Sequence, residues 1–288
     1  MKAHLRPLLL SALLICFAAI PARAELMYAT NGSTIVRFDT LSLGTTTTVA
    51  FSGLQVGETI VGFDIRPANG LLYGVGSSNR LYIINPTTGA TTQVGTAGMF
   101  SLNGTAFGTD FNPLVDRIRQ VSNTEQNIRL NPNDGTLTAT DTALNPAGNV
   151  VAVAYSNNFV GAGSTTLYAI DSASGTLGII TNPNGGGPIT TVGSLGLGTN
   201  LNENIGFDIS GVSGIGFASI TTGGISRLYS INLTTGAATL MGAIGSGTTP
   251  YLGLTAATAV PEPSTYMLFG AAAGLLAIHR FRARRKIS

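Results

Sequence analysis

The sequence predicts an all-β fold, a single β-propeller with five four-stranded blades. Three observations predict it. Apolar runs are short and break at Gly, Pro or Asn, and no segment of the body keeps a 3.6-residue hydrophobic period. A strand-and-turn pattern recurs along the chain. Finally, the two ends of the body supply complementary parts of one repeat, as a closed ring of blades requires.

The clearest repeated element is a strand that ends in Asp or Asn and is followed by a Gly. A side-chain oxygen at that position can bond to the backbone two residues on, and Gly supplies the positive φ of a tight hairpin. The copies begin 46, 46, 40 and 61 residues apart, and we interpret 182–188, in the longest interval, as an inserted loop. They span 35–39, 81–85, 127–131, 167–171 and 228–232. Their last residues, predicted to serve the turns, are Asp39, Asn85, Asn131, Asp171 and Asn232.

A second element, with the pattern Gly-x-Asp, precedes the hairpin in three repeats, at 62–67, 108–113 and 206–208. In the other two repeats, 150–154 and 251–254 occupy its place. Each repeat then has four strands: the Gly-x-Asp strand, a strand like that at 70–75, the strand that ends in Asp or Asn, and a Thr-rich strand after the turn. Four strands in about 40–46 residues are typical of a propeller blade.

The ends of the body predict how the ring closes. Residues 25–50 supply only the last three strands of a repeat, and 248–257 supply only a first strand. Together they make a fifth blade, so the N- and C-terminal strands close a domain that spans 25–258. The alternative, an open β-solenoid, would not need complementary half-repeats at its ends.

The N-terminus is typical of a secretory signal peptide over 1–24. Lys2 and Arg6 precede an apolar stretch over 8–20, and Ala24 ends a small-x-small cleavage site. We therefore expect an exported protein.

The C-terminus, 259–288, combines three unlike features in order. Pro261, Glu262 and Pro263 lie in the motif at 260–265, an apolar segment follows at 264–279, and 280–286 carries five Arg and Lys residues. The apolar segment predicts a transmembrane helix, and the basic tail should stay cytoplasmic. The body then faces outward.

This C-terminus resembles the PEP-CTERM sorting signal of bacterial surface proteins. The resemblance implies recognition by an exosortase, cleavage at Pro261–Pro263 and association with exopolysaccharide. It also implies an inner-membrane anchor before processing and a periplasmic, cell-surface or extracellular fate afterwards. The body resembles the family catalogued as domain of unknown function 4394 over most of 26–256. The resemblance lies in two repeated motifs, Leu-Tyr-x-Ile-Asn/Asp-x-x-x-Gly and Gly-Phe-Asp-x-x-Pro. That resemblance implies a propeller-like domain and brings no known catalytic residues.

Charge and composition exclude several functions. Between Glu25 and Glu262 there are seven Arg, no Lys and 13 acidic residues, a net charge of −6. Binding to nucleic acid needs clustered positive charge, so we do not expect it. The same body has no His and no Cys, which excludes thiol nucleophiles, Ser-His-Asp relays and His or Cys zinc sites within one chain.

The Gly-x-Asp repeats place Asp64, Asp110 and Asp208 at one repeat position. If that strand is the innermost of each blade, the three carboxylates gather at one mouth of the channel. There they could bind a cation such as calcium or a polar ligand. The alternative is that each Asp serves the turn after its own strand. We expect no other cofactor.

Two further groups of side chains have a functional and a structural interpretation. Tyrosines at equivalent positions could stack on sugars or pack between blades, and we favour packing. They are Tyr73, Tyr82, Tyr168 and Tyr229. We interpret Arg117, Arg119 and Arg129, close to Asp116 and Glu125, as a solvated, locally paired face.

The leading hypothesis is therefore a non-enzymatic propeller, displayed outside the inner membrane, that binds or scaffolds matrix polysaccharide. One alternative is a hydrolase or lyase that uses carboxylates, with or without a cation, on extracellular polysaccharide. Another is a structural spacer without a ligand.

Overall fold

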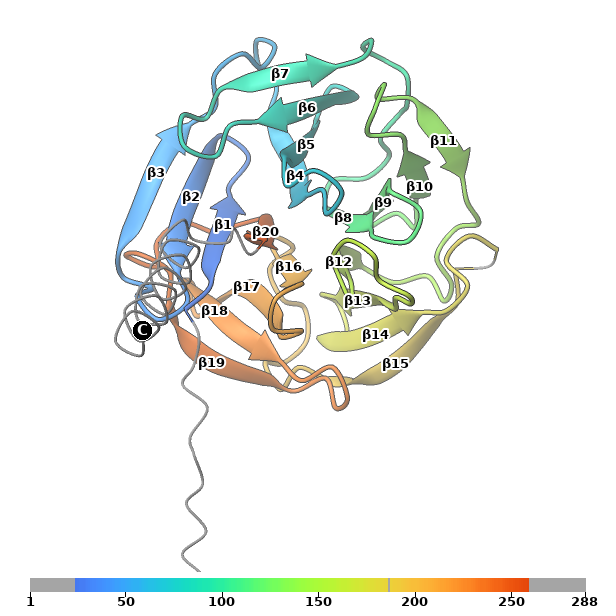
Figure 1. Cartoon of the computed structure of the whole chain (residues 1–288). Helices are drawn as coiled ribbons and strands as arrows, with labels where there is room; N and C mark the ends of the chain where they lie inside the picture. Colours follow the sequence, from blue (N-terminus) through green and yellow to red (C-terminus); the bar gives the residue numbers. More distant parts are fainter. Residues whose placement is uncertain (1–23, 186, 259–288) are drawn as a thin grey trace, which may run out of the picture.

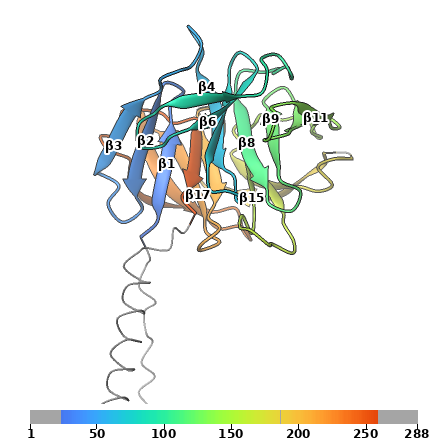
Figure 2. The ribbon, with the colours of Figure 1, turned by 45° about the horizontal axis from the view of Figure 1, so that its top comes forward.

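The described residues form twenty strands in five antiparallel sheets around a central axis (Figure 1). The structure is a computed structural model that describes residues 24–185 and 187–258. Each sheet has four strands, and Figure 2 shows the strands running between two faces made of loops. The prediction of an all-β, five-bladed propeller is confirmed.

In each blade the strands are ordered from the axis outward. The five blades are β20 (Gly253–Ala256), β1 (Leu26–Thr30), β2 (Thr34–Asp39) and β3 (Thr46–Ala50); β4 (Ile60–Ile65), β5 (Leu72–Gly76), β6 (Arg80–Ile84) and β7 (Thr91–Val94); β8 (Phe107–Asn112), β9 (Arg117–Ser122), β10 (Asn127–Leu130) and β11 (Leu137–Thr140); β12 (Val150–Tyr155), β13 (Leu167–Asp171), β14 (Thr176–Ile180) and β15 (Ile189–Ser194); and β16 (Gly206–Ile209), β17 (Gly216–Thr222), β18 (Ile225–Ile231) and β19 (Ala238–Ala243).

The ring closes in the blade that contains both ends of the body. Strand β1 pairs with β20 in antiparallel register, with Met27 opposite Ala256 and Ala29 opposite Leu254. The predicted joining of an N-terminal three-strand unit to a C-terminal strand is confirmed. Residues 25–258 therefore contain every strand of the five blades.

The strand order corrects the predicted phase of one repeat. In four blades the segment that ends in Asp or Asn is the third strand, but 167–171 is β13, the second strand of its blade. The third strand there is β14, and 182–188 connects it to β15. The third strands begin at Thr34, Arg80, Asn127, Thr176 and Ile225. These positions are nearly evenly spaced, so the irregular intervals of the sequence repeat arose from that one misplaced copy.

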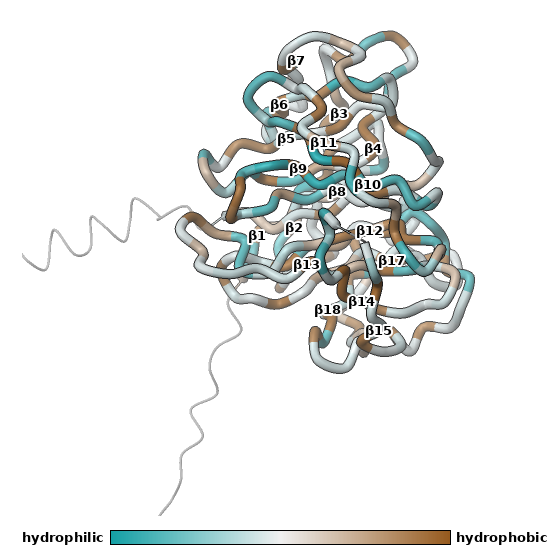
Figure 3. The backbone as a smooth tube through the Cα atoms, turned by 90° about the vertical axis from the view of Figure 1, so that its right-hand side faces the viewer, coloured by the Kyte–Doolittle hydropathy of each residue, from teal (hydrophilic) through white to brown (hydrophobic). Residues whose placement is uncertain are grey.

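Burial decreases from the axis outward. Every residue of β12, β16 and β20 is buried, whereas the outer strands β3 and β11 are mostly exposed. Figure 3 shows hydrophobic and hydrophilic stretches interspersed along the chain, as expected for strands that bury some side chains between blades and expose others. One contact between blades is the edge-on stacking of Tyr73 on Phe111, with ring centroids 5.4 Å apart.

The predicted turn residues act as expected. The side-chain Oδ1 of Asp39, Asn85, Asn131 and Asn232 accepts the backbone N–H two residues on, and that of Asp171 accepts the N–H three residues on.

The predicted signal peptide, except Ala24, and the whole C-terminal signal lie outside the described residues. Ala24 is exposed just before β1. The predicted transmembrane helix at 264–279 and the motif at Pro261–Pro263 are not described. Among the described residues, no helix is long and apolar enough to cross a membrane.

Candidate functional site: a carboxylate ring on the channel axis

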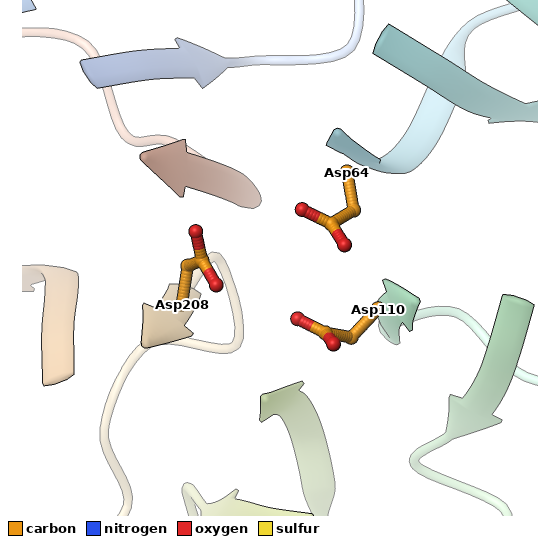
Figure 4. Close-up of side chains that lie close together, drawn as sticks. All are labelled: Asp64, Asp110 and Asp208. Atoms are coloured by element: carbon orange, nitrogen blue, oxygen red, sulfur yellow. The ribbon is translucent and has the colours of Figure 1, made fainter. Parts of the chain in front are cut away.

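Asp64, Asp110 and Asp208 lie together at the centre of the propeller, near the ends of β4, β8 and β16 (Figure 4). One oxygen of each lies within 4.8 Å of the others, and each residue is only 1% exposed. We call these three residues the carboxylate ring. Of the two alternatives that the sequence left open for these residues, the structure shows the one in which the carboxyl groups gather on the axis.

Each carboxyl group of the ring bonds to the innermost strand of the next blade. In every case the acceptor is a carboxylate oxygen and the donor is a backbone N–H. The bonds are Phe111 N to Asp64 Oδ2 (2.8 Å), Tyr155 N to Asp110 Oδ1 (3.1 Å) and Ala256 N to Asp208 Oδ2 (2.6 Å). The carboxylates therefore join neighbouring blades at the axis, a role that the sequence interpretation did not include.

The two inner strands without an Asp carry Ala154 and Thr255 at this place, each directly before an N–H donor of the ring. Ala154 has no side-chain acceptor, and the Thr255 hydroxyl donates to Asp64 instead of accepting from the next blade. In the blade that follows each of these two strands, the Asp accepts the backbone N–H of the residue directly after it. Ile65 N donates to Asp64 Oδ1 (2.7 Å), and Ile209 N donates to Asp208 Oδ1 (2.6 Å). The predicted alternative was that each Asp serves the turn after its own strand; these two bonds instead stay within the strand, at the last residue of β4 and of β16.

Three carboxyl groups therefore accept a backbone N–H from each of the five inner strands. Five of the six oxygens accept one backbone N–H each. The sixth, Asp110 Oδ2, is buried and has no hydrogen-bond partner. The Thr255 hydroxyl adds a bond of 2.7 Å to Asp64 Oδ1.

Negative charge in the ring is poorly compensated. Burial raises the pKa of Asp64 well above its usual value, and the charge of Asp208 raises it further. Burial, followed by the charges of both neighbours, also raises the pKa of Asp110 well above its usual value. Burial raises the pKa of Asp208 to about 6. None of the four ion pairs among the described residues reaches the ring.

On one side of the ring the channel is almost closed. Two residues before each ring position the inner strands carry Gly or Ala, and a cavity of about 10 Å³ lies between them. That volume is about the minimum for one water molecule. At Gly206 a Cβ would lie 2.5 Å from the carbonyl carbon of Gly253, so only glycine permits this approach of the strands. On this side the described residues leave room for about one water molecule, which is too little for a sugar.

A larger cavity of about 500 Å³ lies at the other end of the inner strands. We call it the mouth pocket; its lining includes Pro67, Asn158, Phe159, Val160, Val212 and Thr258. Pro67 and Thr258 follow the ring positions of their strands by three residues, which places the mouth pocket just beyond the carboxylate ring. Phe159 is 46% exposed, while Asn158 is buried and its Oδ1 has no partner. The sequence interpretation missed this pocket because its residues follow no motif.

The structure buries the tyrosines rather than presenting them to a ligand. Tyr73, Tyr82 and Tyr229 are at most 4% exposed, and Tyr168 is half-buried. The Tyr82 hydroxyl donates to Glu58 Oε2 (2.6 Å), and burial followed by this bond raises the pKa of Tyr82 to about 12. The interpretation that tyrosines pack within the propeller is confirmed.

The interpretation of the three arginines as a solvated face is wrong for Arg119. This side chain is 1% exposed and donates to Asp141, Asn127 and the Tyr155 hydroxyl. It also donates to the Pro183 carbonyl, at 3.4 Å, in the 182–188 loop. Pro183 and Asn184, in the loop between β14 and β15, cover the guanidinium, which the local sequence around Arg119 does not indicate. Nor does Asp116 pair with these arginines, because it pairs with Arg66.

Fold and site define a five-bladed propeller whose inner strands are joined by carboxylates on the axis. The chain belongs to the family described as domain of unknown function (DUF4394), whose model matches residues 34–255. Residues 259–286 match the PEP-CTERM protein-sorting motif. This motif implies export, membrane-anchored sorting by an exosortase, and a cell-surface or extracellular fate.

Two solved structures illustrate the wider likeness. A structural genomics protein of unknown function from Bacteroides thetaiotaomicron is 13% identical with a TM-score of 0.49, and the match covers 75% of this chain and 57% of that one. PorZ, a surface component of the type-IX secretion system of Porphyromonas gingivalis, is 15% identical with a TM-score of 0.39, and the match covers 76% and 28%. No curated protein matches the chain.

Proposed function

We propose that this exosortase-sorted protein is a non-enzymatic binding module that associates with exopolysaccharide outside the inner membrane. The mouth pocket carries the proposal. It combines a half-exposed aromatic ring, Phe159, with the amide of Asn158, whose buried oxygen has no partner. An apolar surface beside a few polar groups is the usual composition of a small-ligand site, and a sugar offers both a C–H face and hydroxyl donors.

The chemistry of the body supports binding over catalysis. Between Glu25 and Thr258 there is no His, Cys or Lys, so the carboxylates are the main candidates for general acid or base. In the carboxylate ring, five of six oxygens already accept backbone N–H groups, and all three residues are buried. A group that holds blades together is poorly placed to exchange protons with a substrate.

The test is glycan binding by the 25–258 fragment, which contains every strand. We expect binding to exopolysaccharide on an array and in solution, and about fivefold weaker binding for Phe159→Ala, since one stacked ring contributes on the order of 1 kcal/mol. Leu240→Ala removes an equally exposed apolar side chain on the outer strand β19 and should bind like the wild type. Absence of binding to every glycan would favour the spacer alternative, and unchanged binding by Phe159→Ala would exclude the mouth pocket.

The alternative of a carboxylate-dependent hydrolase or lyase draws on one observation. A pKa of about 6 for Asp208 is in the range that suits a general acid near neutral pH. The test is the release of new chain ends from exopolysaccharide. If Asp208→Asn loses this activity and Phe159→Ala keeps it at saturating substrate, the protein is a hydrolase or lyase and not only a binding module.

A further inference from the structure

The unpartnered oxygen of the carboxylate ring needs a partner that the described residues do not supply. Asp110 Oδ2 is buried, and Figure 4 shows the three carboxyl groups pointing toward one another, with Asp110 directed at its two neighbours. A buried carboxylate oxygen without a hydrogen bond is strongly unfavourable unless a proton or a cation binds it. The other charges of the ring add to the demand for positive charge.

The size of the ring fits one cation. The three ligand oxygens lie within 4.8 Å of one another. In an equilateral triangle of that side the centre lies about 2.8 Å from each corner, and any shorter side brings it closer. Calcium binds protein oxygens at about 2.3–2.6 Å, whereas magnesium needs about 2.0–2.1 Å. At this upper limit a slight inward movement of the side chains reaches calcium distances, whereas magnesium distances need a larger one.

The existing hydrogen bonds leave the oxygens able to bind a metal. Each carboxylate oxygen has two lone pairs; both are used only at Asp64 Oδ1, and Asp64 Oδ2 keeps one beside its bond to Phe111 N. Thr255 Oγ, which donates to Asp64, brings a fourth oxygen to the ring. All of these are hard oxygen ligands, the type that calcium prefers, and water would complete its shell of six to eight.

From these observations we infer that the carboxylate ring binds one calcium-class divalent cation. The cation would bind the same three carboxyl groups that join the five inner strands, so its binding would stabilise the closed propeller. Calcium sites of extracellular modules have dissociation constants of about 10⁻⁴–10⁻³ M. The inference is independent of glycan binding at the mouth pocket, since different residues carry it.

The test is calcium binding by the chain from Glu25 to Ser288, purified in detergent and freed of metal with EDTA. We expect isothermal titration at pH 7.5 to give one calcium per chain, with a thermal midpoint that rises and saturates over the same range. Magnesium should bind at least tenfold more weakly. Asp110→Asn keeps an acceptor for Tyr155 N but removes the free carboxylate oxygen, and it should weaken calcium binding at least tenfold.

Two further variants separate binding from folding. Asp134→Asn removes a fully exposed loop carboxylate and should bind calcium like the wild type. Thr255→Val removes the hydroxyl oxygen with little change in shape and should weaken binding several-fold, which keeps the inference testable if Asp110→Asn folds poorly. A wild type without a saturable calcium response would overturn the inference. So would equal calcium affinity in a folded Asp110→Asn or, failing that variant, in Thr255→Val.

Discussion

Asp110→Asn provides the sharpest prediction about the carboxylate ring in the absence of metal. The amide oxygen can still accept Tyr155 N, and the amide NH₂ places two donors where Asp110 Oδ2 now has no partner. The substitution therefore removes one of three buried charges and supplies hydrogen bonds to its neighbours. We expect the variant to be more stable than the wild type in EDTA at pH 7.5.

The magnitude follows from the charges that the ring carries. At an effective dielectric constant of about 20, two full charges 4.8 Å apart repel by about 3.5 kcal/mol. Asp110 has two such neighbours, or about 7 kcal/mol between full charges, but carboxyl groups take up protons before they bear that repulsion. A rise from the ordinary pKa of 3.8 to about 6, as at Asp208, corresponds to about 3 kcal/mol. We therefore expect a gain of roughly 3 kcal/mol.

The assay is thermal unfolding followed by circular dichroism. For a domain of this size, about 3 kcal/mol corresponds to a rise of roughly 6–12 °C in the midpoint. Asp134→Asn, the exposed control, should stay within about 2 °C of the wild type. Saturating calcium should stabilise the wild type and leave Asp110→Asn nearly unchanged, so the difference should shrink or reverse. An Asp110→Asn midpoint in EDTA equal to or below that of the wild type would refute the charge argument.

Three further predictions concern the ring, a buried arginine and the axial glycines. Because the pKa values of the ring are raised in the folded state, the folded ring binds more protons than the unfolded chain above pH 3.8. The ring therefore contributes to stability at low pH. This contribution is lost as pH rises through the folded pKa, which is about 6 for Asp208. In EDTA the wild-type midpoint relative to Asp110→Asn should therefore fall between about pH 4 and 7, and a constant difference across thermal scans would contradict this. Arg119→Leu leaves the buried Asn127 Oδ1 without a donor and leaves Asp141 paired with Arg129 alone, so it should lose about 1–3 kcal/mol in denaturant unfolding, with faster proteolysis in the 182–188 loop; cleavage and midpoint like the wild type would contradict it. Gly206→Ala places a Cβ against backbone and should lose about 2–3 kcal/mol, whereas Gly44→Ala, with nothing within 4 Å, should change little; equal midpoints would show that the strands can separate.

The architecture could be predicted from the sequence because each level of local information agreed. Turn residues such as Asn85 and Asn232 recur with a Gly four residues on, and the half-repeats at the two ends match each other. The misplaced fourth copy shows the limit of this reasoning. Segment 167–171 has the same Leu-Tyr start as 81–85 and 228–232 and, like them, a Gly four residues after its final Asp or Asn, because second and third strands both need buried alternation and a tight turn. Only its pairing with β12 reveals its place.

The sequence offered the position of the candidate site as one of two alternatives and did not predict its bonding. Gly-x-Asp repeats placed three carboxyl groups on the axis, since residues at one repeat position share one radius. Their main partners are backbone N–H groups 45–48 residues away, in the next blade. Such donors have no side-chain signature, because any residue except proline supplies one. Arg119 was misinterpreted for a related reason: the loop that buries it lies more than 60 residues further along the chain.

The composition of the ring can be explained by counting acceptors. Five inner strands present five N–H groups to the axis, from Ile65, Phe111, Tyr155, Ile209 and Ala256. With one bond per oxygen, two carboxyl groups would leave one N–H unpaired, whereas five would place five charges in a buried ring. Three is the smallest number that serves all five, which accounts for Ala154 and Thr255 at the remaining positions. Three carboxyl groups have six oxygens, so one is left over in any such arrangement. The free oxygen of Asp110 therefore follows from the five-fold geometry, and it is the atom at which the ring can respond to a cation.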